Sequence, residues 1–345
     1  MRIQRKLTLL GVAAALVLGA CDTGTGDDLN VDDTPTGAST EDGDGGGDGG
    51  TVTIAFSAPG ADHGWLAALT DNAREEAERY DDVEFNLLEG TNDSAAQESQ
   101  IRQLINDQPD VLVILPHEGG PLTPVAQEAM DAGIPVVNVD REFESLTAFR
   151  TWIGGDNYGI GVSAGNFIAE ELDCKGNVVE IQGLAGISVT EQRTAGFADT
   201  IEARCGDGIK VVAQQPADFV PDKGERVMSA ILQAEDQIDA VYTHDDDMAE
   251  GVVAAIENAD RQDEMFVTGA GGSTAAMERI KDGGLYKATF LYNPSMSASA
   301  VRIARLIALG EGMEDLVEPE VPSRIQLPAT TVTAENVDAM MELGY

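Results

Sequence analysis

The chain has 345 residues, of which 61 are Asp or Glu and 21 are Lys or Arg, and its formal net charge is −40 at pH 7. This charge argues against nucleic acid and anionic lipid as partners, because both are bound through basic patches. It favours a heavily solvated surface, as in adaptation to high salt, and the length is typical of two domains.

The first twenty residues have the layout of a secretory signal. Arg2, Arg5 and Lys6 precede a twelve-residue apolar run, Leu7–Leu18. A membrane-spanning helix needs about 20 apolar residues, so this run is too short to be one. An ordinary core segment is the alternative, but the polar tract that follows offers it no partner. We predict a signal peptide over residues 1–20.

The segment Leu18-Gly19-Ala20-Cys21 resembles the end of a bacterial lipoprotein signal. The resemblance implies that Cys21 is diacylated, and two acyl chains would anchor the protein stably to a membrane. Residues 21–50 contain nine acidic residues, nine glycines and no Lys or Arg, so we predict a disordered tether. Calcium binding by this tract is the alternative, although EF-hand spacing is missing.

From Thr51 onward the sequence alternates short β-branched runs with amphipathic stretches, which is typical of parallel sheets covered on both faces. Several runs are continuously apolar, as strands buried on both faces are. The predicted strands are Val52–Ser57, Val83–Glu89, Val111–Leu115, Ile134–Asp140, Asn177–Gln182, Ile209–Gln215, Ala240–Thr243, Met265–Gly269 and Tyr286–Leu291. The predicted helices are Leu66–Tyr80, Ser94–Asp107, Thr123–Ala132, Ile160–Leu172, Thr190–Ala203, Asp222–Ala234, Met248–Asn258, Ser273–Asp282 and Ser295–Leu309.

These elements predict an α/β fold of two Rossmann-like lobes, each a parallel sheet covered by helices on both faces, joined by a multi-strand hinge. We expect residues 51–154 and 293–316 to form the N-terminal lobe. Residues 155–292 and 317–345 should form the C-terminal lobe and tail. The crossings are expected near Gly155, Tyr292 and Val317–Ser323.

Two cysteines remain besides Cys21. Cys174 lies three residues before one predicted strand, and Cys205 lies four before the next. A right-handed crossover places both strand starts on the same rim of the sheet. We predict a disulfide that would stabilise the fold by about 3–4 kcal/mol. Two buried free thiols are the alternative.

Ligands of open parallel sheets bind beyond the carboxyl ends of the strands. Polar and aromatic residues, including all three histidines, follow the predicted strand ends. They are His63, Trp65, His117, Asp140, Arg141, Arg193, Phe219, His244, Asp245 and Tyr292. We therefore predict a ligand site at this rim.

The body, Thr51–Tyr345, resembles the periplasmic sugar-binding proteins of ribose, galactose and galactofuranose type, which have the type I binding-protein fold and serve ABC importers. The segments that carry the resemblance are Val139-Asp140-Arg141-Glu142, Val179-Glu180-Ile181-Gln182-Gly183, Glu191-Gln192-Arg193, Gln215-Pro216-Ala217-Asp218-Phe219 and His244-Asp245-Asp246-Asp247-Met248. It implies a monosaccharide or polyol ligand, an ABC permease as partner, no cofactor or metal, and no nucleic acid. It also implies an extracytoplasmic, lipid-anchored monomer that is not an enzyme.

The resemblance also implies residue roles. Asp140 and Asp245 would accept hydrogen bonds from sugar hydroxyls, and the guanidinium groups of Arg141 and Arg193 would donate them. The other expected ligand contacts are Trp65, Phe219, Tyr292, His63 and His117. Where ribose receptors have Gly-Phe-Asp-Gly, this chain has Gly269-Ala270-Gly271-Gly272. Ribose is therefore disfavoured, and the space that glycine leaves favours another monosaccharide, a polyol or a larger glycoside.

Structural roles are open for several of these residues. Asp140-Arg141 would also suit an ion pair, Trp65 the core, and Arg193 a solvated helix surface. We expect Asp246 or Asp247 to cap the helix that starts near Met248, and we place Trp152 in the core.

Two other function classes are open. A metal-dependent enzyme would use His63, His117 and His244, although no zinc-binding spacing occurs among them. A chemotaxis or signalling receptor would share the fold and cannot be separated from a transport protein by sequence. The exported N-terminus and the missing helix-turn-helix exclude a repressor.

Overall fold

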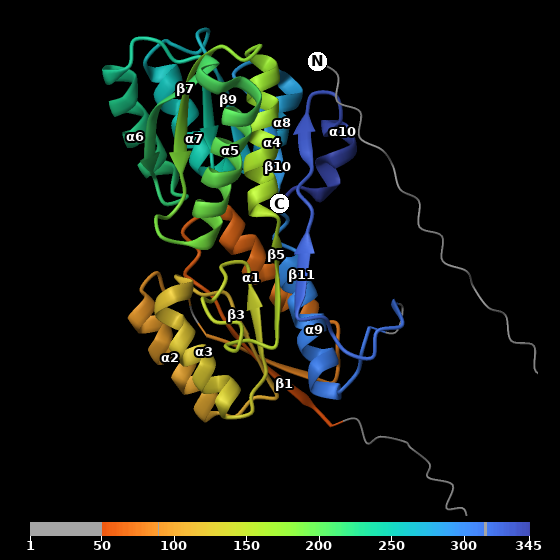
Figure 1. Cartoon of the computed structure of the whole chain (residues 1–345). Coiled ribbons are helices and arrows are strands. Elements are labelled where there is room, and N and C mark those ends of the chain that lie inside the picture. Colours follow the sequence, from red (N-terminus) through yellow and green to blue (C-terminus); the bar gives the residue numbers. More distant parts are fainter. Residues whose placement is uncertain (1–49, 89, 314–315) are drawn as a thin grey trace, which may run out of the picture. The chain divides into compact units, whose positions relative to one another are not determined.

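The computed structural model describes residues 50–88, 90–313 and 316–345. The predicted signal peptide, the lipidation residue Cys21 and nearly all of the predicted tether lie outside these ranges. In the part that is described, the chain forms two six-stranded sheets, each with helices on both faces (Figure 1). The predicted α/β fold class is confirmed.

The first sheet has the strand order β11-β5-β4-β3-β1-β2, and all its pairs are parallel. Its strands are β1 Val52–Ser57, β2 Val83–Leu87, β3 Val111–Ile114, β4 Val136–Val139, β5 Thr151–Gly155 and β11 Arg324–Leu327. Its helices are α1 Gly64–Ala77, α2 Ser94–Asn106, α3 Gly119–Asp131 and α9 Met296–Leu309. Buried side chains of α2 and α3 cover one face, and those of α1 and α9 cover the other. These elements form the first lobe.

The second sheet has the order β12-β10-β9-β8-β6-β7, in which only the pair β10–β12 is antiparallel. Its strands are β6 Gly176–Gln182, β7 Ile209–Pro216, β8 Ala240–Thr243, β9 Phe266–Gly271, β10 Tyr286–Leu291 and β12 Thr331–Thr333. Its helices are α4 Asn157–Glu171, α5 Ser188–Cys205, α6 Pro221–Ala234, α7 Asp246–Asn258, α8 Thr274–Asp282 and α10 Val337–Met340. These elements form the second lobe, with α4 and α5 on one face and α6, α7 and α8 on the other.

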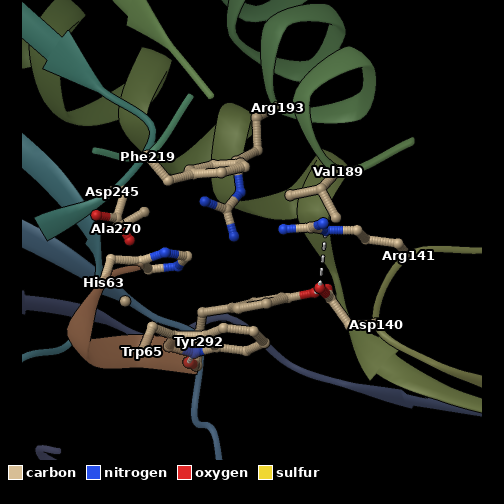
Figure 2. Close-up of a pocket in the computed structure, with 11 residues that line it drawn as sticks. His63, Trp65, Asp140, Arg141, Val189, Arg193, Phe219, Asp245, Ala270 and Tyr292 are labelled. Carbon is tan, nitrogen blue, oxygen red and sulfur yellow. Dashed lines mark hydrogen bonds and ion pairs between the residues drawn. The ribbon is translucent and has the colours of Figure 1, made fainter. Parts of the chain in front are cut away.

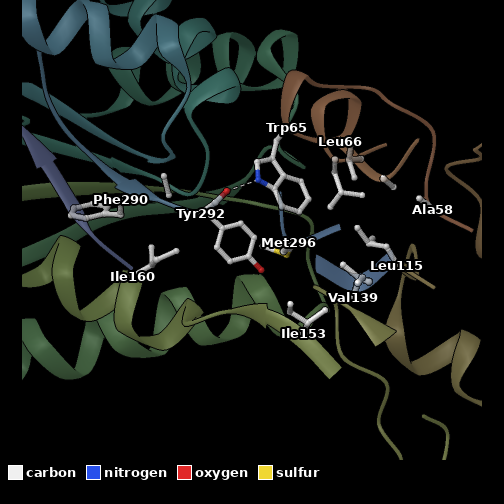
Figure 3. Close-up of a cluster of buried hydrophobic side chains, with 14 of the residues drawn as sticks. Ala58, Trp65, Leu66, Leu115, Val139, Ile153, Ile160, Phe290, Tyr292 and Met296 are labelled. Atoms are coloured by element: carbon white, nitrogen blue, oxygen red, sulfur yellow. Dashed lines mark hydrogen bonds between the residues drawn. The ribbon is translucent and has the colours of Figure 1, made fainter. Parts of the chain in front are cut away.

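The apolar pattern of the sequence explains this packing. Leu66, Leu69, Ala73 and Ala77 recur every three or four residues and form the buried stripe of α1. One buried cluster joins residues of both lobes, so that Ile160 and Phe290 belong to the same group as Trp65 and Leu115 (Figure 3). The segment that crosses between the lobes after β10 is thus part of the core.

Three crossings connect the lobes: β5 to α4, β10 to α9, and β11 to β12. The first two lie at Gly155 and Tyr292, as expected. The third lies at residues 328–330 and not at Val317–Ser323, because β11 pairs with β5 in the first sheet. Residues 324–327 therefore belong to the first lobe, whereas the sequence prediction had placed all of 317–345 in the second.

The predicted disulfide is confirmed. Cys174 and Cys205 are bonded, with 5.0 Å between their Cα atoms. Cys174 precedes β6, and Cys205 ends α5 just before β7, so the bond lies at the amino ends of neighbouring parallel strands. Over the described ranges, no helix combines the length and the apolar character needed to cross a membrane.

Candidate functional site

A cavity of about 20 Å³ lies at the carboxyl ends of strands from both lobes. Eleven residues line it, and Figure 2 shows their side chains converging from several elements. They are His63, Trp65, Asp140, Arg141, Val189, Arg193, Phe219, Asp245, Ala270, Gly271 and Tyr292. Eight of the nine predicted ligand-binding residues are among them, and His117 is not.

Asp140 and Arg141 follow β4 and are both buried. Asp140 has the left-handed φ of 61°, an uncommon conformation for a residue with a side chain, and its carbonyl accepts the Trp152 Nε1 hydrogen at 3.0 Å. The predicted core position of Trp152 is confirmed. Arg141 Nε lies 3.9 Å from Asp140 Oδ2, so an ion pair forms inside the cavity wall. Burial raises the pKa of Asp140, although the charge of Arg141 opposes the change.

His63 and Trp65 enter from the start of α1. His63 Nδ1 lies 2.6 Å from Asp62 Oδ1, and the imidazole stacks on Phe219 with 5.9 Å between ring centroids. Burial by itself lowers the pKa of His63, but the hydrogen bond to Asp62 and the charge of Asp245 outweigh it and raise that pKa. Trp65 Nε1 donates to the Tyr292 carbonyl at 2.6 Å. Trp65 therefore belongs to the core and to the cavity wall at once.

Arg193 is 3% exposed, so the solvated position considered from the sequence is wrong. Its Nε donates to Asn157 Oδ1 at 2.9 Å, and its Nη1 donates to the His244 carbonyl. The guanidinium carbon lies 4.7 Å from the centroid of the Tyr292 ring. The Tyr292 hydroxyl donates to Asp140 and accepts from Asn157 Nδ2 at 3.1 Å. A buried network thus joins Arg193 of the second lobe to Asp140 of the first.

Phe219 also has a left-handed backbone, with φ of 66°, and its ring fills the place that a Cβ at Gly183 would occupy. A Cβ there would lie 2.0 Å from the ring, so only glycine fits at this position of the second lobe. Residues with uncommon backbone conformations often mark functional sites. Both Phe219 and Asp140 fit that pattern.

Asp245 is the N-cap of α7, and its Oδ1 accepts from the Met248 amide at 2.8 Å. The expectation that Asp246 or Asp247 would be the cap is wrong, because α7 begins two residues before Met248. Asp246 is fully buried and accepts from the Tyr286 hydroxyl at 2.7 Å. Burial raises the pKa of Asp245 to about 7. Asp245 therefore serves the helix and the cavity together.

His117 and His244 do not enter the cavity. The His117 amide donates to Gln97 and its carbonyl accepts from Arg141 Nη1 at 2.7 Å, so it positions Arg141 through the backbone. His244 is fully buried, with Nε2 lying 2.8 Å from Glu180 Oε1. The three histidines therefore do not converge, and no group of His, Cys, Asp or Glu among the described residues is arranged to hold a metal ion.

Sequence reasoning missed Val189 as a cavity residue, since an aliphatic side chain at a helix start carries no chemical signal. The glycine-rich segment was noted, and Ala270 and Gly271 do line the cavity. Gly271 has φ of 135°, and a Cβ there would meet the Tyr345 hydroxyl at 2.8 Å.

Residues 54–312 match the family model described as periplasmic binding protein domain. The chain belongs to the periplasmic binding protein family. This periplasmic binding protein is 30% identical to the galactofuranose-binding protein YtfQ of Escherichia coli (strain K12) over 305 residues. The match covers 85% of the present chain and 93% of YtfQ. The sequence-based resemblance to the galactofuranose type is confirmed, and the family is one of binding proteins and not of enzymes.

Solved structures agree with the fold. An ABC transporter solute-binding protein from Bacillus halodurans C-125 with bound myo-inositol is 29% identical, with a TM-score of 0.78 over 86% of this periplasmic binding protein and 99% of that chain. The fructose-binding periplasmic domain of a hybrid two-component system is 30% identical, with a TM-score of 0.76 over 84% and 93%. The type I binding-protein fold is confirmed.

Proposed function

We propose that this protein captures a monosaccharide or a polyol in the cavity between its lobes and delivers it to an ABC permease. The observation that carries the proposal is the convergence of Asp140 and Arg141 from one lobe with Arg193 and Asp245 from the other. The similar proteins with galactofuranose or myo-inositol in their names support this ligand class.

The cavity offers the chemistry that an uncharged polyhydroxylated ligand needs. Asp140 accepts hydrogen bonds from hydroxyl groups, whereas Arg141 and Arg193 donate to hydroxyl and ring oxygens. The rings of Trp65 and Phe219 offer surfaces for the C–H faces of a sugar. Hydrogen bonds to charged groups contribute about 1.5–3 kcal/mol each. Four of them, less an association cost of at least about 4 kcal/mol, are compatible with low-micromolar affinity.

The lobes would close over the ligand by rotation at the three crossings, the hinge motion common among binding proteins. Tyr292 lies at one crossing, and its ring occupies the place of a Cβ at Gly155, which lies at another. Its hydroxyl contacts Asp140, which lines the cavity. Ligand contact and hinge geometry would therefore be linked through this side chain.

The ligand would be larger than ribose or different from it in shape, since Ala270 and Gly271 replace a bulky ring and a carboxylate. His63 would supply a hydrogen-bonding group from the opposite lobe. With a pKa of about 7, the carboxyl of Asp245 can donate or accept a hydrogen bond near neutral pH. These features favour a hexose, in pyranose or furanose form, or a cyclic polyol.

The protein would act outside the cytoplasm as a monomer, anchored by acyl chains on Cys21 and held at a distance by the acidic segment 21–50. The disulfide supports an oxidising compartment. Mass spectrometry of the membrane fraction tests the anchor, since a diacylated Cys21 as the first residue is expected. An unmodified mature N-terminus elsewhere would contradict it.

A thermal-shift screen with pentoses, hexoses and cyclic polyols tests the ligand class. A ligand at about 100 times its Kd stabilises the folded state by about 2.7 kcal/mol, so the right compound raises the melting temperature by several degrees. Small-angle scattering should then show a smaller radius of gyration. A broad panel that produces neither change would contradict the proposal.

A sensory role is the second candidate, because the fructose-binding domain of a two-component system shares this fold at 30% identity. Neighbouring genes distinguish the two roles. Permease and ATPase genes support import, and a sensor kinase gene supports signalling.

A further inference from the structure

Helix α1 of the first lobe starts without a cap of its own. His63 is the N-cap residue but makes no capping hydrogen bond, and the first turn contains no acidic residue. The amide hydrogens at such a helix end need partners, and a carboxylate is the most favourable one.

The partner comes from the second lobe. Asp247, in the first turn of α7, accepts the Trp65 amide hydrogen with its Oδ2 at 3.1 Å. The approach is close, because a Cβ at Gly64 would lie 3.0 Å from Asp247 Oδ1. The same oxygen also accepts from the Tyr345 hydroxyl at 3.4 Å. A carboxylate held within the second lobe thus caps a helix of the first.

A second contact of the same kind lies elsewhere between the lobes. The amide of Glu142, which follows β4 in the first lobe, donates to Ser188 Oγ at 3.2 Å. Ser188 is the first residue of α5 in the second lobe. Again a backbone amide of the first lobe is satisfied by a side chain at a helix start of the second. Neither Asp247 nor Ser188 lines the cavity.

We infer that Asp247 and Ser188 are positioning residues that hold the lobes closed and so set the affinity for the ligand without contacting it. The inference rests on the proposed function. Both bonds join groups on different lobes, so they break when the lobes separate. An interaction present only in the closed form shifts the equilibrium toward that form. Ligand bound between the lobes then dissociates more slowly.

The test is calorimetric titration of the full-length protein with D-galactose, D-ribose and myo-inositol, followed by stopped-flow dissociation of whichever binds most tightly. A cap hydrogen bond contributes about 1 kcal/mol, so Asp247→Ala should raise Kd about fivefold, mainly through faster dissociation. Ser188→Ala, which removes a neutral bond, should raise it about threefold. The double variant should approach the product of the two, about fifteenfold. Asp247→Asn keeps an acceptor oxygen and should recover part of the affinity.

Matched controls lie within one lobe. Asp93 caps α2 by accepting from the Ala96 amide at 2.7 Å, and Ser99 Oγ donates to the Ala95 carbonyl at 3.0 Å in the same helix. Asp93→Ala and Ser99→Ala should leave Kd within about twofold even where the melting temperature falls.

The outcomes separate the inference from the function. If the wild type, Asp247→Ala and Ser188→Ala bind the same compound with equal Kd, the inference is overturned and the proposed function is not. Wild-type protein that binds none of the three, nor any other compound of the thermal-shift panel, overturns the proposed function for this ligand class, and the inference with it. If Asp247→Ala does not fold, Asp247→Asn and Ser188→Ala decide the question.

Discussion

Replacing Asp245 by Asn should make the stability of the protein less dependent on pH. The carboxyl is buried at the edge of the cavity, and Asn keeps an oxygen that can accept from the Met248 amide. Burial raises the pKa of Asp245 from 3.8 to about 7; His63 opposes this increase, and Asp247 adds to it. The substitution removes this titration and keeps the helix cap.

Proton linkage gives the direction and the size of the pH effect on the free energy of unfolding. Because the pKa is higher in the folded protein, the contribution of Asp245 to stability is fully present below pH 3.8 and is lost as the pH rises through about 7. Each pKa unit corresponds to about 1.4 kcal/mol. Between about pH 5 and pH 8, the wild-type protein should therefore lose about 2.5 kcal/mol that the variant does not lose.

Urea denaturation of both proteins at several values between about pH 5 and pH 8 measures this difference. The free energy of unfolding of Asp245→Asn, relative to the wild type, should increase steadily with pH. Asp71→Asn, the same substitution at an exposed position of α1, serves as the control. Parallel profiles for the wild type and Asp245→Asn would refute the reasoning.

Two further predictions concern the disulfide and Arg193. Replacing both Cys174 and Cys205 by Ala opens a loop with a sequence separation of 31 and should cost about 3.5 kcal/mol in urea denaturation. Sugar affinity should not change, since the disulfide lies at the opposite strand ends from the cavity. A loss of stability below about 1 kcal/mol would contradict the first expectation, and a clear change in Kd would contradict the second. Arg193→Lys should weaken sugar binding about tenfold to a hundredfold in calorimetry, because the single nitrogen of an ammonium cannot occupy the separate positions from which Nε and Nη1 bond Asn157 and the His244 carbonyl. A change below about threefold would contradict that role.

The sequence was most informative where strands are buried on both faces. Val111–Ile114 and Ala240–Thr243 are apolar or β-branched throughout and fully buried, so their sequences alone identified them. Three strands were missed: the interior strand Thr151–Gly155, whose residues are all buried, and the edge strands Arg324–Leu327 and Thr331–Thr333. Arg324–Leu327 alternates exposed and half-buried residues and pairs only with β5, and Thr331–Thr333 has three residues, so tertiary pairing decides both.

The position of a residue after a strand predicted whether the residue lies near the cavity. It did not predict whether the side chain points into the cavity or into the core. His244 and Asp245 are neighbours, yet one faces the core and the other the cavity. Strand alternation would have assigned His244 correctly, because Tyr242, two residues earlier, shares its face and packs against it with 4.9 Å between ring centroids. The bridge that Asp247 makes to Trp65 depends on the packing of two lobes, which no local pattern encodes.

The most direct test of the site is a crystal structure of the protein grown with the sugar or polyol that gives the largest thermal shift. The molecule should lie in the cavity, with hydroxyl groups bonded to Asp140, Arg193 and Asp245 and a C–H face against Phe219 or Trp65. Binding at another surface, or a cavity without the compound while the protein is saturated in solution, would contradict the account.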